Sequence, residues 1–134
     1  MTLLFLGEAE PGVWPLVPPA VAGLPSPQFS VKGVVGVPRR RPRLFALDLE
    51  DLGGHGAAMH GAVCEALGME VERPFWPHVT LVRVRRGRKP EAPAPGHLEP
   101  FAPTALTLYR SHPGPRGSRY EAMERVALGE GGRS

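Results

Sequence analysis

The sequence predicts an α+β fold with a mainly antiparallel sheet and one or two helices. Short runs of β-branched and apolar residues recur along the 134-residue chain, separated by turn-forming or basic residues. Only residues 52–67 carry a long pattern of helical spacing. Several runs are joined by links short enough for hairpins, which favours antiparallel pairing. We expect one domain over residues 1–128 and a disordered tail at 129–134.

The N-terminal part of the chain is expected to hold a strand and a short helix. Residues 2–6 form an apolar run after a threonine, and Gly7 follows them, so we predict a strand that ends there. Prolines interrupt the helical spacing of residues 11–24. Because proline suits only the first turn of a helix, any helix in this segment is short and begins near Pro18 or Pro19.

A hairpin and a helix are expected next. Residues 29–35 alternate and are rich in β-branched side chains, and residues 44–49 form a second apolar run, so both are predicted strands. The Arg/Pro segment 38–43 between them is the expected turn. The firm part of the helix is predicted at residues 57–67, with Gly68 as its terminator, because glycines weaken the stretch before it.

Three further strands are expected in the second half, at residues 78–84, 104–110 and 120–128. A Pro-rich basic loop separates the first of them from the second, and a turn at residues 113–117 joins the last two. The helix would cover one face of the sheet, and the open face would carry the chemistry.

Basic residues gather in two clusters, within a chain of 16 Lys+Arg and 13 Asp+Glu. Such clusters attract anions, including nucleic acid, although they also occur as solvated turns that only aid solubility. The first cluster consists of Arg39, Arg40, Arg41 and Arg43, and the second of Arg83, Arg85, Arg86, Arg88 and Lys89.

The composition argues against several classes of protein. Cys64 is the single cysteine, so no internal disulfide can form. No apolar run is long enough to span a membrane, and the N-terminus lacks the basic leader of a signal peptide. We therefore expect a cytoplasmic protein with no membrane partner.

His78 and Thr80 are the most informative pair of residues, because they stand two positions apart at the start of an apolar run. Side chains at i and i+2 of a strand point to the same face, so an imidazole and a hydroxyl would share one small volume. The ring can move a proton, and the hydroxyl can donate a hydrogen bond to an anionic oxygen. This pair suits a phosphate. Each residue also has a plain alternative, as a half-buried strand histidine and an ordinary β-branched strand residue.

Two stretches carry a family resemblance. Residues 77–83, Pro-His-Val-Thr-Leu-Val-Arg, resemble the second signature of the two-histidine phosphoesterases, in the branch of 2'-5' RNA ligases or RNA 2',3'-cyclic phosphodiesterases. Residues 2–8, Thr-Leu-Leu-Phe-Leu-Gly-Glu, resemble the end of the first signature, in which a histidine stands two positions before the threonine. The resemblance runs from Thr2 to about Leu128, supported by the hairpin that contains residues 107–121. It implies a two-lobed fold with a pseudo-twofold axis.

The register of the first signature places its histidine one position before Met1. We therefore expect a chain that lacks this histidine and also lacks the family's first strand and helix, through either a mis-assigned start or a real truncation. His55, His60, His97 and His112 are the conceivable stand-ins.

The resemblance implies hydrolysis of a 2',3'-cyclic phosphate to a 2'-phosphate, in RNA or a nucleotide, and some members act on 2'-5' linkages. One histidine removes a proton from water and the other protonates the departing 3' oxygen, while two threonines hold the phosphoryl oxygens. The implied catalytic residues here are His78, Thr80 and Thr2. No metal or other cofactor is required. Loss of one proton-transfer group costs about 100- to 10,000-fold, so weak or no turnover is expected of this chain.

Arg83 and Phe75 are the candidate substrate-binding residues. Arg83 matches a basic residue often seen after the second signature, but strict alternation would place it on the face opposite His78, so a bulge or a strand end is needed to bring it round. Phe75 and its neighbour Trp76 could stack on a base, although such residues more often belong to a core or a lip.

Three hypotheses remain open. The chain is an RNA 2',3'-cyclic phosphodiesterase from a shortened reading frame, a non-catalytic nucleotide- or RNA-binding remnant of the same fold, or a structural domain with an unrelated partner surface.

Overall fold

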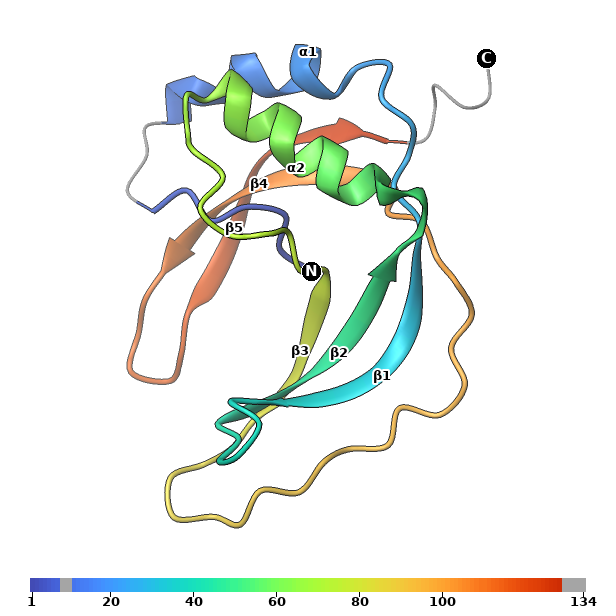
Figure 1. Cartoon of the computed structure of the whole chain (residues 1–134). Coiled ribbons are helices and arrows are strands. Elements are labelled where there is room, and N and C mark those ends of the chain that lie inside the picture. The colour runs from blue at the N-terminus through green and yellow to red at the C-terminus, as the bar shows by residue number, and fades with distance from the viewer. Residues whose placement is uncertain (8–10, 129–134) are drawn as a thin grey trace.

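The computed structural model describes residues 1–7 and 11–128, so the tail expected at residues 129–134 lies outside it (Figure 1). Within these residues the chain forms five strands, two α-helices and two short 3-10 helices. In chain order the elements are a 3-10 helix at Pro11–Leu16, α1 at Val17–Val21, β1 at Phe29–Val37, β2 at Leu44–Asp51, a 3-10 helix at Leu52–Gly54, α2 at His55–Ala66, β3 at His78–Arg83, β4 at Ala105–His112 and β5 at Arg119–Ala127.

The strands form two antiparallel sheets, and the predicted α+β class is confirmed. One sheet has the order β1-β2-β3, and the other is the β4–β5 hairpin. In Figure 1 the two helices lie over β4 and β5, and the three-stranded sheet extends away from them on the other side. The predicted turn at residues 38–43 joins β1 to β2, and the short helix after Pro15 has proline in its first turn, as expected.

The prediction of a strand at residues 2–6 is wrong. This segment has no regular secondary structure and makes no backbone hydrogen bond to a strand in the described part of the chain. Leu3 and Leu4 are held instead by side-chain packing against the buried cluster of helices α1 and α2. An apolar run becomes a strand only when a neighbouring strand accepts and donates its backbone hydrogen bonds, and no described strand does so here.

Helix α2 begins where Asp51 accepts two of its free N–H groups. The amides of Gly56 and Ala57 each donate to a different oxygen of the Asp51 carboxylate at 2.8 Å. Gly53 and Gly54 have φ of 72° and 74°, so the chain can turn sharply enough to bring the end of β2 over the start of the helix. A carboxylate at this end also complements the helix dipole. Gly68 follows the helix with φ of 68°, in the terminating role that the sequence predicted.

Two apolar clusters stabilise these layers. The first joins α1 and α2 to the second sheet and is built on Val17, Val21, Met59 and Val63. The second lies on one face of the three-stranded sheet and is built on Phe29, Leu47 and Leu49, with Val31, Val34, Phe75 and Val79 around them. We call the opposite face of this sheet, on which Thr80 is exposed, the open face.

The long segment between β3 and β4 runs around the end and the far side of the three-stranded sheet (Figure 1). Near its end, Phe101 exchanges two backbone hydrogen bonds of 2.9 Å with Phe29, so it adds a short bridge to the β1 edge. This contact anchors the loop to the same residue that forms the centre of the second apolar cluster.

Candidate active site

His78 and Thr80 lie on the open face of the three-stranded sheet. In β2 the cross-strand partners of these two residues are Asp48 and Ala46. Residues directly opposite each other in an antiparallel pair point to the same face, so Asp48 joins His78 there. Val79 between them packs into the second apolar cluster on the other face. The predicted pairing of imidazole and hydroxyl on one face thus agrees with the register.

The indole of Trp76 covers His78. The two rings are stacked with centroids 3.9 Å apart and planes 15° apart. The indole Nε1–H donates a hydrogen bond of 2.8 Å to Oδ1 of Asp48, which holds the ring across β2. Lys32 lies 3.8 Å from Oδ2 of the same carboxylate. These contacts hold the indole in place against one face of the His78 ring.

The backbone carbonyl of Trp76 orients the His78 imidazole. Nδ1 of His78 lies 2.9 Å from this oxygen. A carbonyl oxygen only accepts, so Nδ1 must carry the proton and donate. In the neutral ring, Nε2 is then left without a proton, ready to act as a base, and in the charged ring Nε2 carries the proton that an acid would give.

A bulge in β3 brings Arg83 to the open face. Thr80 pairs with Ala46 and Val82 with Phe45, so Leu81 is the extra residue between two successive partners. Arg83 then pairs with Leu44, which shares the face of Ala46 and Asp48 by alternation along β2. The sequence required such a bulge for Arg83 to join His78 and Thr80, and the structure contains one.

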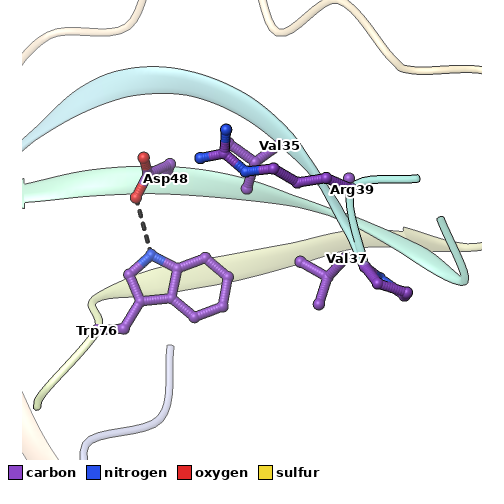
Figure 2. A pocket seen from close by; sticks show the side chains of 7 residues that line it. Val35, Val37, Arg39, Asp48 and Trp76 are labelled. Carbon is purple, nitrogen blue, oxygen red and sulfur yellow. Dashed lines mark hydrogen bonds between the residues drawn. The ribbon is translucent and has the colours of Figure 1, made fainter. Parts of the chain in front are cut away.

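A shallow pocket lies beside Trp76 on this face. Its volume is about 270 Å³. Figure 2 shows the indole and the Asp48 carboxylate at one end, the side chains of Val35 and Val37 along it, and Arg39 extended over Val35 in the direction of Asp48. An aromatic ring, an apolar wall and an arginine are suited to a base and a phosphate.

No protein-family model matches the chain, and no curated protein sequence matches it. Several solved structures do. TT0787 of Thermus thermophilus is 26% identical with a TM-score of 0.70, over 94% of this chain and 75% of that chain. A structure described as a phosphoesterase is 23% identical with a TM-score of 0.66, over 94% of this chain and 74% of the other. E. coli LigT complexed with 3'-AMP is 23% identical with a TM-score of 0.61, over 94% and 74%.

This chain has the two-histidine phosphoesterase fold. The similarity to E. coli LigT in three dimensions concerns the fold, and it agrees with the resemblance of residues 77–83 to a two-histidine phosphoesterase signature.

Phe75 does not lie on the face of the sheet that carries His78. Its ring stacks on His60 with centroids 5.4 Å apart and packs against Phe29, so it belongs to the apolar cluster on the opposite face. Trp76, rather than Phe75, is the aromatic residue of the site. Neighbouring residues of an extended segment point to opposite sides, so Trp76 shares a face with His78 while Phe75 lies on the other face.

Thr2 is exposed, in the N-terminal segment that forms no strand. Figure 1 draws the N-terminal end of the chain beside the start of β3, and Figure 2 shows the same segment beneath Trp76. The two views therefore agree in placing this end near the site.

The four histidines considered as replacements for the first-signature histidine make their contacts elsewhere in the fold. His60 is only 9% exposed and lies 3.8 Å from Sγ of Cys64, inside the protein. His97 and His112 each place Nε2 2.9 Å from a carboxylate, Glu99 and Glu121 respectively. His55 opens helix α2, and its ring lies close to Gly53. None of these contacts brings a second imidazole to His78.

Sequence reasoning missed Asp48 and the part that Trp76 plays. Asp48 is the sole charged residue in the apolar run 44–49, and alternation places it opposite the buried Leu47 and Leu49. This single carboxylate in an apolar run was the feature of the sequence that could have identified Asp48 as a site residue. Among the described residues no group of three or more metal-ligating side chains exists, and no described helix has the length and apolar character needed to cross a membrane.

Proposed function

We propose that this chain is an RNA 2',3'-cyclic phosphodiesterase domain in which His78 transfers a proton and Thr80 holds the phosphate. The observation that carries the proposal is the hydrogen bond from His78 Nδ1 to the Trp76 carbonyl, at 2.9 Å, on the face that Thr80 shares. It leaves Nε2 as the one nitrogen that can exchange a proton with a bound phosphate ester or water.

In this scheme a water oxygen attacks the phosphorus of the cyclic ester and the P–O3' bond breaks. One group accepts the proton of the water, and another gives a proton to the departing 3' oxygen, which leaves a 2'-phosphate and a free 3'-hydroxyl. His78 serves as one of these two groups. The Thr80 hydroxyl donates a hydrogen bond to a phosphoryl oxygen, whose negative charge grows in the transition state.

The second proton-transfer group belongs to the N-terminal segment. The resemblance puts it two positions before Thr2, and the N-terminal end lies near the start of β3 in both views. Thr2 would then donate to a second phosphoryl oxygen, as Thr80 does to the first. Arg83 binds a more distant part of the substrate, because the β2 partners of Arg83 and His78, Leu44 and Asp48, lie four strand residues or about 13 Å apart.

The known complexes of a structural neighbour support a nucleotide ligand. E. coli LigT has been crystallised with 3'-AMP, with NADP+ and with ATP. The pocket beside Trp76, with its indole, valines and Arg39, is of a kind that accepts a base and a phosphate.

The test is hydrolysis of adenosine 2',3'-cyclic phosphate, with products separated by chromatography. The chain is compared with two extended versions that carry either Met-His or Met-Ala directly before Met1. We expect the Met-His form to exceed the Met-Ala form by about 100-fold or more, and His78→Ala in the Met-His form to lose about 100- to 10,000-fold. His97→Ala is the matched control and should have no effect, since Glu99 already engages that ring.

Three results would count against the assignment. Activity that survives His78→Ala, or equal activity of the Met-His and Met-Ala forms, would remove the proposed role of a histidine pair. A 3'-phosphate as the product would contradict the proposed cleavage of the P–O3' bond.

A non-catalytic nucleotide-binding domain is the second candidate. It is favoured by the single imidazole that the described residues place on the face of Thr80, beside a preformed pocket. This candidate predicts that all forms bind 3'-AMP in calorimetry and that none, including the Met-His form, hydrolyses the cyclic ester.

A further inference from the structure

The two basic clusters of the sequence lie at the same end of the three-stranded sheet. The β1–β2 turn contains the first cluster, and the second begins where β3 ends. Leu44 pairs with Arg83, and the amide of Val84 donates a hydrogen bond of 2.8 Å to the carbonyl of Arg43, so the clusters are joined through the backbone. This end of the sheet lies away from the helices (Figure 1).

A hollow with a volume of about 300 Å³ lies at this end. We call it the basic hollow, because Arg83, Arg85, Arg88 and Lys89 line it against a single carboxylate, that of Glu91. Its floor is apolar and consists of Phe45, Val82 and Val84. The ion pairs among the described residues involve other cations, so none of them neutralises this rim.

The floor of the basic hollow faces away from the proposed catalytic site. Phe45 pairs with Val82, and alternation along β2 places Phe45 on the face of Leu47, opposite the face of Asp48 and His78. A substrate held at His78 on the open face therefore leaves this floor uncovered, and Val82 is 44% exposed there. Exposed apolar surface and gathered like charges both destabilise the free protein, and both costs fall when an acidic, apolar group fills the hollow.

A hollow of this kind fits an apolar side chain that has a carboxylate on either side. The apolar group would lie on the floor, and the carboxylates would accept charge-assisted hydrogen bonds from the arginines of the rim. Among the large exposed apolar side chains of the described residues, Val71 alone has this setting, between Glu70 and Glu72. Val71 is 53% exposed, and both glutamates are exposed as well.

The segment that carries Val71 is held at both of its ends. The amide of Met69 donates a hydrogen bond of 2.8 Å to the carbonyl of Cys64 in α2, and the carbonyl of Pro77 accepts one of 3.1 Å from the amide of Leu49 in β2. Between these anchors, residues 70–74 are exposed and form no helix or strand. We call residues 70–72 the acidic segment. Because its ends are fixed, it loses less conformational entropy on binding than a free tail would lose.

In one copy of the chain, the acidic segment and the basic hollow lie beyond opposite ends of β3, so they do not meet. The segment leads from α2 to the start of β3, whereas the hollow lies at the end of the sheet away from the helices (Figure 1). Two copies arranged antiparallel bring each acidic segment to the hollow of the other copy. Such a pair has a twofold axis and two identical contacts, so it closes after two copies.

We propose that the basic hollow of one copy binds the acidic segment of a second copy, so that the protein forms a twofold dimer in which Val71 contacts Phe45 and Val82. The observation that carries the proposal is the match between the two surfaces, an apolar floor with a basic rim and an exposed valine between two carboxylates. The dimer goes beyond the proposed function, because the chemistry at His78 does not depend on it.

The first test is sedimentation equilibrium of the protein from low micromolar to near-millimolar concentrations. The mass should rise from that of one copy, 14.4 kDa, to that of two copies and no further. Added salt should weaken the association, because ion pairs at an exposed rim are screened. Val71→Ser should weaken it by about 10-fold or more, since both contacts lose a buried valine. Leu98→Ser removes another exposed apolar side chain and should have no effect.

An exchange of charges distinguishes this contact from a general attraction to anions. One variant carries Glu70→Arg and Glu72→Arg, and the other carries Arg85→Glu and Arg88→Glu. Each should be monomeric by itself, because like charges then face each other in both contacts. An equimolar mixture should form a dimer of one copy of each, since both contacts again join opposite charges.

The matched control makes the same charge change on the β4–β5 hairpin, through Arg116→Glu and Arg119→Glu. Mixed with the variant of the acidic segment, this control should leave that variant monomeric, because its own hollow is still basic.

A single copy at every concentration, assembly beyond two copies, or a mixture of the two charge variants that stays monomeric would overturn the proposal. An equal effect of Val71→Ser and Leu98→Ser would do the same. Oligouridylate and phosphatidylserine vesicles are the alternative ligands to be tested. If Arg85→Glu and Arg88→Glu abolish binding of either one while the mass stays that of the parent protein, the basic hollow serves that ligand and not a second copy.

Discussion

His78 and Trp76 stack face to face, with ring centroids 3.9 Å apart, while the Trp76 carbonyl holds Nδ1 of the same imidazole at 2.9 Å. One residue thus supplies both a wall and a hydrogen-bond acceptor to the proposed catalytic ring. Asp48, on the neighbouring strand, holds the indole in turn. The proposed site is therefore a chain of contacts across β2 and β3 rather than a histidine and threonine alone.

The first prediction concerns the proton of His78. When neutral, this imidazole should carry its proton on Nδ1, because the partner of Nδ1 is a carbonyl. His97 and His112 should be the opposite tautomer, since their Nε2 atoms face carboxylates. Nitrogen-15 NMR of the ring nitrogens distinguishes the two forms directly. An Nε2-protonated, neutral His78 would contradict the orientation on which the proposed function depends.

The second prediction concerns the bulge at Leu81. Deletion of Leu81 should preserve the pairs Thr80–Ala46 and Arg83–Leu44, because only the unpaired residue is removed. Contacts between Arg83 and Leu44 should remain visible as NMR cross-relaxation, and 3'-AMP should still bind.

Deletion of Val79 is the contrasting variant. It would place His78 and Thr80 next to each other on opposite faces, since a one-residue slip turns side chains to the other side of a sheet. Nucleotide binding should then be lost. If both deletions behave alike, the bulge does not decide which residues share the face.

The third prediction concerns Gly56, where helix α2 meets the sheet. A Cβ at this position would lie 2.8 Å from Asp51 Oδ1, 2.9 Å from Phe75 Cε2 and 3.0 Å from Phe29 Cε1. At Gly61, in the same helix, the corresponding point has no atom within 4 Å apart from its chain neighbours and the nearby backbone of its own helix. Gly56→Ala should therefore be less stable than Gly61→Ala by about 1–3 kcal/mol, measured by urea unfolding.

Alanine is preferred over glycine by about 1 kcal/mol in a helix interior, where Gly61 lies. Gly56 lies in the first turn and gains less, so the difference between the two variants contains this preference as well as the clash. Gly61→Ala should exceed the parent protein in stability. Equal stability of the two variants would mean that α2 does not approach the sheet as closely as the structure indicates.

The fourth prediction concerns Cys64 and alkaline pH. Burial raises the pKa of this thiol above its ordinary value of 9.0, and the residue is 1% exposed. The unfolded chain then loses the thiol proton at a lower pH than the folded protein does. The contribution of the neutral thiol to stability is therefore complete below about pH 9 and is lost as the pH rises toward the folded pKa.

The measurement is the free energy of unfolding between pH 8 and pH 10, for the parent protein and Cys64→Ala. The parent should lose up to about 1.4 kcal/mol per pH unit more than the variant, which has no thiol to ionise. A parallel pH dependence of the two proteins would show that burial does not shift this group.

Rules that act over a few neighbouring residues were sufficient to predict much of this fold from the sequence. The hairpin of β1 and β2, helix α2 with Gly68 after it, and the shared face of His78 and Thr80 all follow from alternation, helical spacing and turn residues, which act over a few positions. The same rules showed that Arg83 required a bulge, without showing that one was present.

Only the tertiary structure decided which distant residues meet. The register of β2 against β3 put Asp48 beside His78, and the unpaired Leu81 put Arg83 on their face, because backbone pairing between strands is not encoded in either strand alone. The segment at residues 2–6 has strand composition but found no described partner, so it stayed irregular. The two arginine clusters met because antiparallel order returns the chain to the same end of the sheet.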